Sequence, residues 1–328
     1  AMIFIGLVKI IPIQLPEPTI SELHTEYGDF LLWKLYYLTN GIATAGYLPV
    51  IGALEIVSGL FLLNRRTAII GSGLLIAVLL NVVIVNYVYE IGEQVYSSFL
   101  LLLAVVIFSY DWPRFYQLLI KKGATVPDGF WPEYGRRIAR IRPYLQVLFL
   151  LLITVFSVQA YLSWKNSDYP FPDEKGLEGA AGVYNVKDFV WKGDTIPYSL
   201  SDTLRWKDVV FEKWNTLSIR GNRSVRVDSL KPHIAFNRER NYEYLGNGGR
   251  EFFAYAIKKG ANKAETAIKL TGKVSKGHTF AFVVNRPDKR TLVLDGVNQL
   301  GDSLHVRLEK INKKYLLQEG RRKPIRIY

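Results

Sequence analysis

The first half of the chain contains long apolar runs, whereas the second half alternates apolar and polar positions. A helix needs about 20 apolar residues to cross the hydrocarbon core of a bilayer. Four runs predict such helices: residues 42–63, 67–89, 95–110 and 144–163. The opening stretch, AMIFIGLVKIIPI, is apolar but too short to cross alone. We expect it to be the end of a fifth helix truncated at the N-terminus, or else a helix lying against the bundle.

After residue 176 the apolar period changes to two, which is typical of strands with one buried face. Eight segments are predicted as strands: 182–191, 206–211, 216–220, 251–257, 266–274, 278–285, 290–297 and 304–311. Short separators rich in Gly, Asn, Asp and Pro predict tight turns between antiparallel neighbours. The expected fold is therefore an α-helical membrane bundle of four to five transmembrane helices, followed by a C-terminal all-β antiparallel barrel or sandwich.

Charge divides the chain at the same place. Residues 1–164 carry 11 Lys and Arg against 10 Asp and Glu, whereas residues 165–328 carry 31 against 19. The polar, proline-bearing stretch KNSDYPFPDEKG at 165–176 is typical of a linker. We therefore expect a transmembrane bundle over 1–164, a linker over 165–176 and a separate β domain over 177–328.

Loop charges predict an orientation, because cytoplasmic loops accumulate Lys and Arg. The turn at Arg65 and Arg66 and the loop 111–143 together hold nine basic residues, but the loops 14–41 and 90–94 hold only Lys34. Residues 111–143 are therefore expected in the cytoplasm and the C-terminal domain outside it. This is the pattern of a multi-pass protein of the bacterial cytoplasmic (inner) membrane.

Composition excludes several kinds of chemistry. The chain has no cysteine, which removes disulfides, thiolate nucleophiles and cysteine-ligated metal centres. With four histidines and no catalytic spacing of Ser, His or carboxylates, we predict no metal and no resident cofactor. The basic residues of the second half are scattered, so membrane lipids with anionic headgroups are more plausible partners than nucleic acid.

Glu55 is the polar residue of the first half that most invites a functional interpretation. An ionisable group at the centre of a span costs about 2.5–3.5 kcal/mol and usually has a partner in the bundle. Gly52 and Gly59 share its helix face and predict close approach of another helix. Lys9 is the expected partner, and Asn81 could bond to either. Glu55, Lys9 and Asn81 form either a site for a ligand, quinone or proton, or a set of polar contacts that hold the helices together.

Two further segments carry polar patterns. In the loop 14–41, Thr19 or Ser21 is expected to cap a short helix. The nearby His24, with Glu22, Glu26 and Asp29, is expected to form a solvated face at headgroup level, the alternative being a metal or acid/base cluster.

The glycine-rich run LGNGGR at 245–250 lacks the Lys-Ser/Thr ending of a phosphate loop and is expected to be a hairpin loop.

Residues 1–120 resemble the DoxX-like family of small membrane proteins. The elements that carry the resemblance are Gly52, Glu55, Gly59, Arg65, Arg66, Gly71, Asn81, Asn86, Asp111 and Arg114, with Gly6, Lys9, Tyr27, Gly28 and Asp29 upstream. The resemblance implies a four-helix core, and some family members accompany quinone-linked oxidation of sulfur compounds. The additional span and the large outer domain of this chain depart from the family pattern.

The start of the β region resembles a lipocalin-like barrel. The resemblance is carried by Gly182-x-Tyr184 followed by Val186. It implies an eight-stranded barrel that either holds one small apolar ligand or is filled by side chains.

The functional hypothesis from the sequence is a non-catalytic membrane anchor or binding protein. Its external lipocalin-like domain would serve a lipid-like ligand or a partner protein. The alternative is a membrane subunit of a quinone-linked, DoxX-type oxidoreductase, with quinone as the cofactor near Glu55 and Asn81. A permease gated around Glu55 is a third hypothesis.

Overall fold

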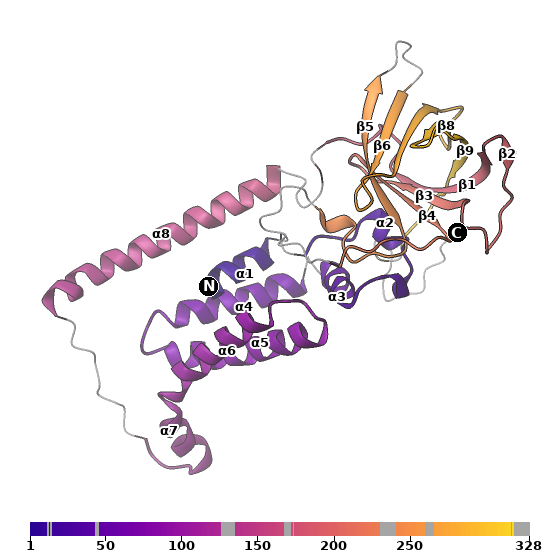
Figure 1. Cartoon of the computed structure of the whole chain (residues 1–328). Coiled ribbons are helices and arrows are strands. Elements are labelled where there is room, and N and C mark those ends of the chain that lie inside the picture. The colour runs from indigo at the N-terminus through magenta and orange to yellow at the C-terminus, as the bar shows by residue number, and fades with distance from the viewer. Residues whose placement is uncertain are drawn as a thin grey trace. The chain divides into compact units, whose positions relative to one another are not determined.

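The computed structural model describes the chain apart from residues 12, 14, 43–45, 126–134, 167–171, 173, 230–240, 260–265, 316 and 318–328. It divides into two compact units, whose elements are labelled in Figure 1. The helical unit comprises Ala1–Pro16 and Ala43–Ser167, and the barrel unit comprises Glu17–Ile42 and Asp168–Tyr328. The segment Glu17–Ile42 therefore packs with the barrel, whereas the sequence pattern assigns it to the bundle.

The helical unit is built from apolar helices of very different lengths. They are α1 (Met2–Ile10), α4 (Tyr47–Phe61), α5 (Ala68–Val88), α6 (Gln94–Ser109), α7 (Trp112–Phe115), the π-helical turn η2 (Tyr116–Ile120) and α8 (Arg136–Asn166). α1 packs along α4, and α5 packs against both α4 and α6. Phe4 of α1 also meets Phe156 of α8 edge to face, with ring centroids 4.8 Å apart.

Fewer helices can cross a membrane than the sequence predicts. Among the described residues, two are long and apolar enough, α5 and α8, rather than four or five. A third would follow only if α6 and the α7–η2 helix, bent by 64° from each other, formed one broken span. α4 has 15 residues and so reaches about 22 Å, short of the ~30 Å hydrocarbon core. The apolar run at 42–63 therefore contains more than its helix.

The bend after α6 has a local cause. Pro113 stands in the first turn of α7, where it starts a new helix but cannot continue an old one, because it lacks the N–H that an interior residue donates. Asp111 precedes it as the N-cap residue of α7. The apolar run at 95–110 consequently ends at Ser109 and does not extend straight into the next helix.

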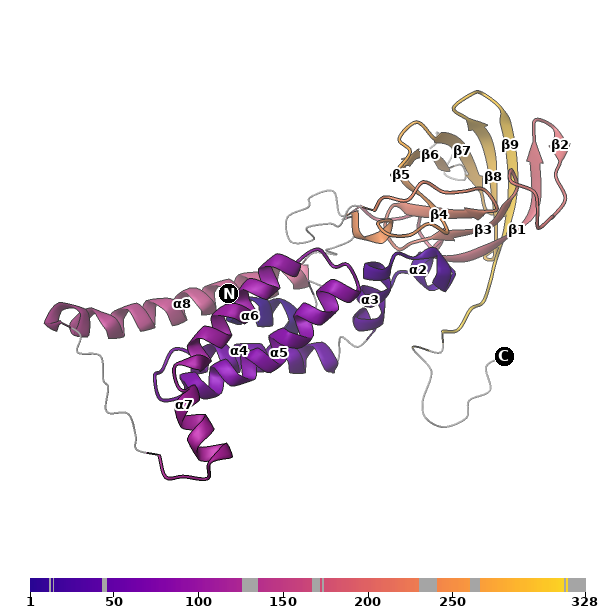
Figure 2. The same cartoon turned by 60° about the horizontal axis from the view of Figure 1, so that its bottom comes forward.

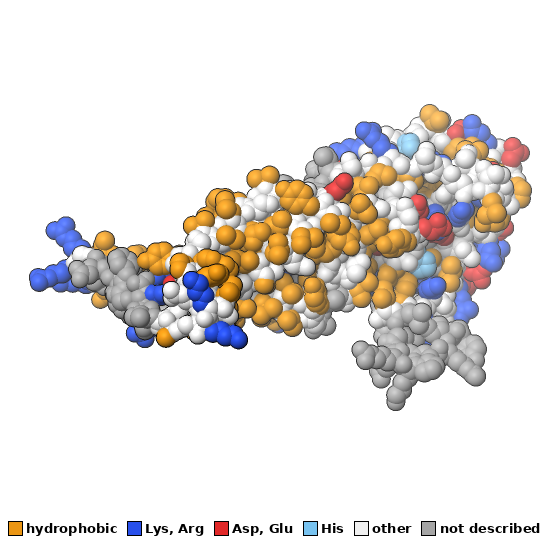
Figure 3. All heavy atoms as spheres, turned by 90° about the horizontal axis from the view of Figure 1, so that it is seen from below, with side chains coloured by type: hydrophobic (Ala, Val, Ile, Leu, Met, Phe, Trp, Pro, Cys, Tyr) orange, Lys and Arg blue, Asp and Glu red, His pale blue; other side chains and the backbone are white. Residues whose placement is uncertain are grey.

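The surface of the helical unit is largely apolar. Leu80 and Ile84 of α5, Leu102 of α6 and Leu148 of α8 are exposed. On the face seen in Figure 3, hydrophobic side chains cover most of the surface that these helices contribute. An exposed apolar surface of this extent marks a region that faces lipid or another protein.

The barrel predicted from the alternating pattern is present. Its strands are β1 (Gly182–Trp191), β3 (Trp206–Phe211), β4 (Thr216–Gly221), β5 (Glu251–Lys259), β6 (Thr266–Gly272), β7 (Thr279–Asn285), β8 (Thr291–Asn298) and β9 (Ser303–Lys310). Each pairs antiparallel with its neighbour, and pairing of β1 with β9 closes the barrel. The two-residue strand β2 (Asp194–Thr195) adds to β1 outside the closed ring.

Inward-facing side chains form an apolar core inside the barrel. The core consists largely of aromatic residues and Leu, Ile and Val, including Phe189, Trp206, Phe211, Phe253 and Phe282, all almost fully buried. Trp206 contacts both Phe280 and Phe282 edge to face, at 5.6 Å and 6.2 Å. Aromatic rings from β3 and β7 therefore meet inside the barrel.

One wall of the barrel is covered on the outside by the segment that precedes α4. This segment forms α2 (Ile20–Leu23), the 3-10 turn η1 (Tyr27–Asp29) and α3 (Leu32–Gly41). Figures 1 and 2 both show α2 beside β3 and β4. Because inward and outward residues alternate along a strand, the outward residues of β3 and β4 face this segment while Leu217 and Ile219 enter the core.

Candidate functional site

The polar pair expected inside the bundle is formed. Lys9 Nζ of α1 lies 2.5 Å from Glu55 Oε1 of α4, and the Glu55 side chain is almost completely buried. The second carboxylate oxygen of Glu55 has no hydrogen-bond partner among the described residues. The pair thus leaves one buried acceptor site unused.

Two glycines on the Glu55 face allow α1 and α4 to approach closely. A Cβ on Gly52 would lie 2.5 Å from the carbonyl oxygen of Gly6, and a Cβ on Gly59 would lie 2.8 Å from Ile3 Cγ1. Neither neighbour leaves room for a methyl group without movement of the backbone or of a packed side chain. The glycines therefore set the helix spacing at which Lys9 reaches Glu55.

Asn81 does not join this pair. It is exposed on the surface of α5. The buried asparagine of α5 is Asn86, whose Nδ2 donates to Ser97 Oγ of α6 at 2.8 Å. The sequence singles out Asn81 by its depth in the run, but a helix turns by 100° per residue, so depth alone does not select the inward face.

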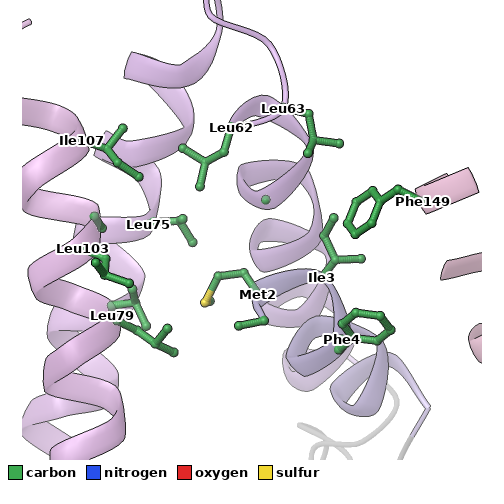
Figure 4. Close-up of a pocket in the computed structure, with 14 residues that line it drawn as sticks. Met2, Ile3, Phe4, Leu62, Leu63, Leu75, Leu79, Leu103, Ile107 and Phe149 are labelled. Atoms are coloured by element: carbon green, nitrogen blue, oxygen red, sulfur yellow. The ribbon is translucent and has the colours of Figure 1, made fainter. Parts of the chain in front are cut away.

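An apolar cavity of about 290 Å³ lies in the helical unit (Figure 4). Met2, Ile3 and Phe4 contribute from α1, Leu75 and Leu79 from α5, and Phe149 from α8, all visible around the space. Gly59, one turn from Glu55 on α4, also lines it. A pocket with such a lining suits a hydrocarbon group.

A second polar group lies in the barrel unit, between α2 and the covered wall. Glu212, next to the end of β3, accepts hydrogen bonds from the Ser21 N–H at 2.7 Å and the Ser21 hydroxyl at 2.6 Å. Ser218 Oγ of β4 donates to Ser21 Oγ at 2.8 Å and accepts from Arg250 Nε at 2.8 Å. Arg250 then forms an ion pair with Asp208 Oδ1 at 2.5 Å. We call Ser21, Asp208, Glu212, Ser218 and Arg250 the wall network.

A buried ion pair holds α3 next to the wall network. Lys34 Nζ lies 2.5 Å from Glu22 Oε1 and donates to the Tyr242 carbonyl at 2.5 Å. Neither charged side chain has measurable exposure. Glu22 also completes a capping box with Thr19, which confirms the predicted cap of the short helix. Glu22 and Lys34 are therefore structural ion-pair partners, and the expected solvated face is wrong for Glu22.

Burial shifts the protonation equilibria of this region. Desolvation raises the pKa of Glu212 to about 7, although the hydrogen bonds from Ser21 act in the opposite direction. Desolvation likewise lowers the pKa of Lys34, against the attraction of Glu22. The pKa of His24 is lowered, first by burial and then by the charge of Arg250. The attachment of α2 to the barrel is thus sensitive to pH near neutrality.

The glycine-rich run at 245–250 also serves this attachment. It precedes β5 at the end of a long connection from β4, so it is not the predicted hairpin loop. The Gly248 N–H donates to the Asp29 carbonyl at 2.8 Å, and the Leu31 N–H donates to the Gly246 carbonyl at 2.9 Å. Gly246 has a φ of +68°, and a Cβ there would lie 2.8 Å from Trp33 Cζ2 and 3.1 Å from Lys34 Cβ. Glycine is therefore favoured at position 246, where the two segments meet.

Neither polar group has the geometry of a metal centre or a nucleophile. Within the described parts of the chain, no three His, Asp or Glu side chains are grouped as metal ligands. Each hydroxyl of the wall network is held by a carboxylate or by Arg250, not by a histidine base. The sequence could not reveal this network, because its members are separated by nearly 200 positions and each resembles an ordinary surface residue.

Comparison with known proteins supplies a partial relative without an assigned role. The chain is 28% identical over 111 residues to the uncharacterized protein YwoB of Bacillus subtilis strain 168. The match covers 34% of this chain and 69% of that protein. No protein-family model matches the chain. No solved structure matches it.

Proposed function

We propose that this chain is a non-catalytic membrane anchor and binding protein of the bacterial cytoplasmic membrane, with its barrel outside. The apolar surface of the helical unit and the lengths of α5 and α8 support insertion in a bilayer. The basic residues at 65–66 and in 111–143 support a cytoplasmic position for those loops. The resemblance to DoxX-like proteins is consistent with a multi-pass arrangement.

The observation that carries the binding role is the exposure of apolar side chains in the loops at one end of the barrel. Aromatic rings from β3 and β7 meet inside the barrel, so we expect binding at its outer surface and loops. Leu200 and Leu300, in loops at the end where β1 finishes, are 76% and 78% exposed. Exposed leucine side chains in the loops of an otherwise charged domain favour binding of a partner protein over binding of a ligand enclosed in the barrel.

The test uses a photo-crosslinking residue in the full chain, expressed in its native membrane. Placed at Leu200 or Leu300, it should give a discrete crosslinked protein band. The matched position Lys269, exposed on a strand of the barrel wall, should give none. Crosslinks to lipid alone, or equal bands from all three positions, would remove the partner-protein role.

A second candidate function is the membrane subunit of a quinone-linked oxidoreductase. It is favoured by the apolar cavity beside α1 and α4, together with the unpartnered oxygen of Glu55 on the same helix pair. The cavity would hold an isoprenoid tail. This function predicts that the purified chain carries co-extracted quinone and that Glu55→Gln lowers its amount. Quinone-free protein from gentle extraction would exclude it.

A further inference from the structure

The end of the barrel at which β1 begins carries basic side chains that the proposed function does not use. Arg286 and Lys289 lie in the turn between β7 and β8, and Lys310 ends β9 directly opposite Tyr184 of β1. Arg286, Lys289 and Tyr184 line a surface pocket of about 320 Å³. We call Arg286, Lys289 and Lys310 the basic cluster.

The basic cluster exceeds the negative charge of the pocket, whose lining contains a single acid. Among the described residues, no carboxylate forms an ion pair with any member of the basic cluster. The one acid in the pocket, Asp288, accepts at Oδ1 from the N–H groups of Arg290 and Thr291 and at Oδ2 from the Thr291 hydroxyl. Partial burial and the neighbouring charge of Arg286 lower the pKa of Lys310. An added anion would relieve this repulsion.

The surrounding backbone brings the cations together. Gly182 has a φ of +142°, and a Cβ there would lie 2.7 Å from Lys310 Cε. Gly179 has a φ of +66° and lies directly under the Arg286 guanidinium. The Tyr184 hydroxyl donates to the Ala180 carbonyl at 2.7 Å, and Lys310 Nζ stands 5.8 Å from the Tyr184 ring. The Gly182-x-Tyr184 motif therefore gives Lys310 a fixed place beside the pocket.

We propose that this pocket binds a phosphate group through Arg286 and Lys289, which line it, with Lys310 adding positive charge from beside it. A guanidinium donates two parallel N–H groups to phosphate oxygens, and ammonium groups add charge without a demand on geometry. Three cations suit the oxygens of a phosphate group, whether it is a singly charged diester or a monoester with up to two charges. The phosphate belongs either to the headgroup of an anionic lipid or to a soluble phosphate ester, which present the same kind of acceptor oxygens to the pocket.

The test compares two double variants of the full chain with the same change in net charge. Arg286→Gln/Lys289→Gln removes two cations from the pocket. Lys269→Gln/Lys276→Gln removes two exposed lysines elsewhere on the barrel. Inorganic phosphate is titrated calorimetrically in a maltoside detergent. In parallel, acylation of Lys310 is followed by mass spectrometry in phosphatidylcholine nanodiscs with and without phosphatidylglycerol.

The proposal predicts that the pocket variant binds phosphate at least about tenfold more weakly, and that the control changes by less than about twofold. Protection of Lys310 by phosphatidylglycerol without binding of inorganic phosphate would identify the lipid headgroup as the source. Protection of Lys310 from acylation by inorganic phosphate would support a soluble phosphate ester as the source. Absence of both effects, or equal loss in the two double variants, would overturn the proposal. Neither result depends on the crosslinks at Leu200 and Leu300, so the two proposals can fail separately.

Discussion

Glu212 Oε1 accepts hydrogen bonds from both the backbone N–H and the hydroxyl of Ser21, which lies 191 residues earlier in the chain. Through this contact the segment that leads into α4 is attached to the outer wall of the barrel. Residues 17–42 and the barrel thus fold as one unit. A fragment that begins at residue 177 would expose the wall network and lose the ion pair of α3.

Replacing Glu212 by Gln should remove a pH dependence of stability. The folded-state pKa of about 7 exceeds the ordinary value of 4.5, so this group contributes its stability fully below pH 4.5 and loses it as the pH rises through 7. The contribution of Glu212 to stability should therefore fall by on the order of 2–3 kcal/mol between pH 5 and pH 8. Glu212→Gln should flatten this slope, as measured by denaturant unfolding of the full chain at several pH values. An unchanged slope would contradict the assignment.

Removing the charge of Lys34 should destabilise the barrel unit strongly. Lys34→Met leaves the buried carboxylate of Glu22 without its cation, which costs about 3–5 kcal/mol. The double variant Lys34→Met/Glu22→Gln should recover much of that loss, because no unpaired charge remains. The control is Lys187→Met, which breaks an exposed pair with Glu309 and should cost less than about 1 kcal/mol. Similar losses for Lys34→Met and Lys187→Met would show that the α3 pair is solvated.

A methyl group on Gly52 should disturb the α1–α4 contact. Because its Cβ would lie 2.5 Å from the Gly6 carbonyl, Gly52→Ala should cost about 1–3 kcal/mol of stability in detergent. Gly73 of α5 is the matched control, since its Cβ would lie 3.4 Å from Phe108 and meets only ordinary contacts. Gly73→Ala should be neutral or slightly stabilising, as for most glycines in helices. Equal melting temperatures for the two variants would mean that α1 does not pack tightly on α4.

The barrel could be predicted from the sequence because the pattern that marks each strand and turn lies within a short stretch of residues. Residues such as Val186 and Leu308 alternate with polar neighbours, and the turns carry Gly, Asn and Asp, so strand positions follow from a period of two. All eight predicted strands are present, most of them within one or two residues of their expected ends. The packing of Trp206 against Phe280 and Phe282 was not predictable, because it depends on how rings from different strands meet.

The sequence predicts the lengths of the membrane helices and the attachment of residues 17–42 to the barrel less well. Hydropathy joins α4 to its flanking residues and does not show the short helices α7 and η2 that follow α6. Glu22 and Lys34 are charged residues in a loop, and nothing nearby in the sequence indicates that both are buried. The Lys9–Glu55 pair could be anticipated because two charges in apolar runs have few alternative partners. Long-range polar contacts such as the one between Ser21 and Glu212 leave no comparable pattern in the sequence.

The most direct test of the account is the side of the membrane on which the barrel lies. Since the chain has no cysteine, single cysteines can be introduced at exposed positions without background. Lys276→Cys, in a turn of the barrel, should react with a membrane-impermeant maleimide on intact cells. Lys121→Cys, in the basic loop, should react only after permeabilisation. Labelling of Lys121→Cys but not Lys276→Cys on intact cells, or recovery of the chain in the soluble fraction without detergent, would contradict the account.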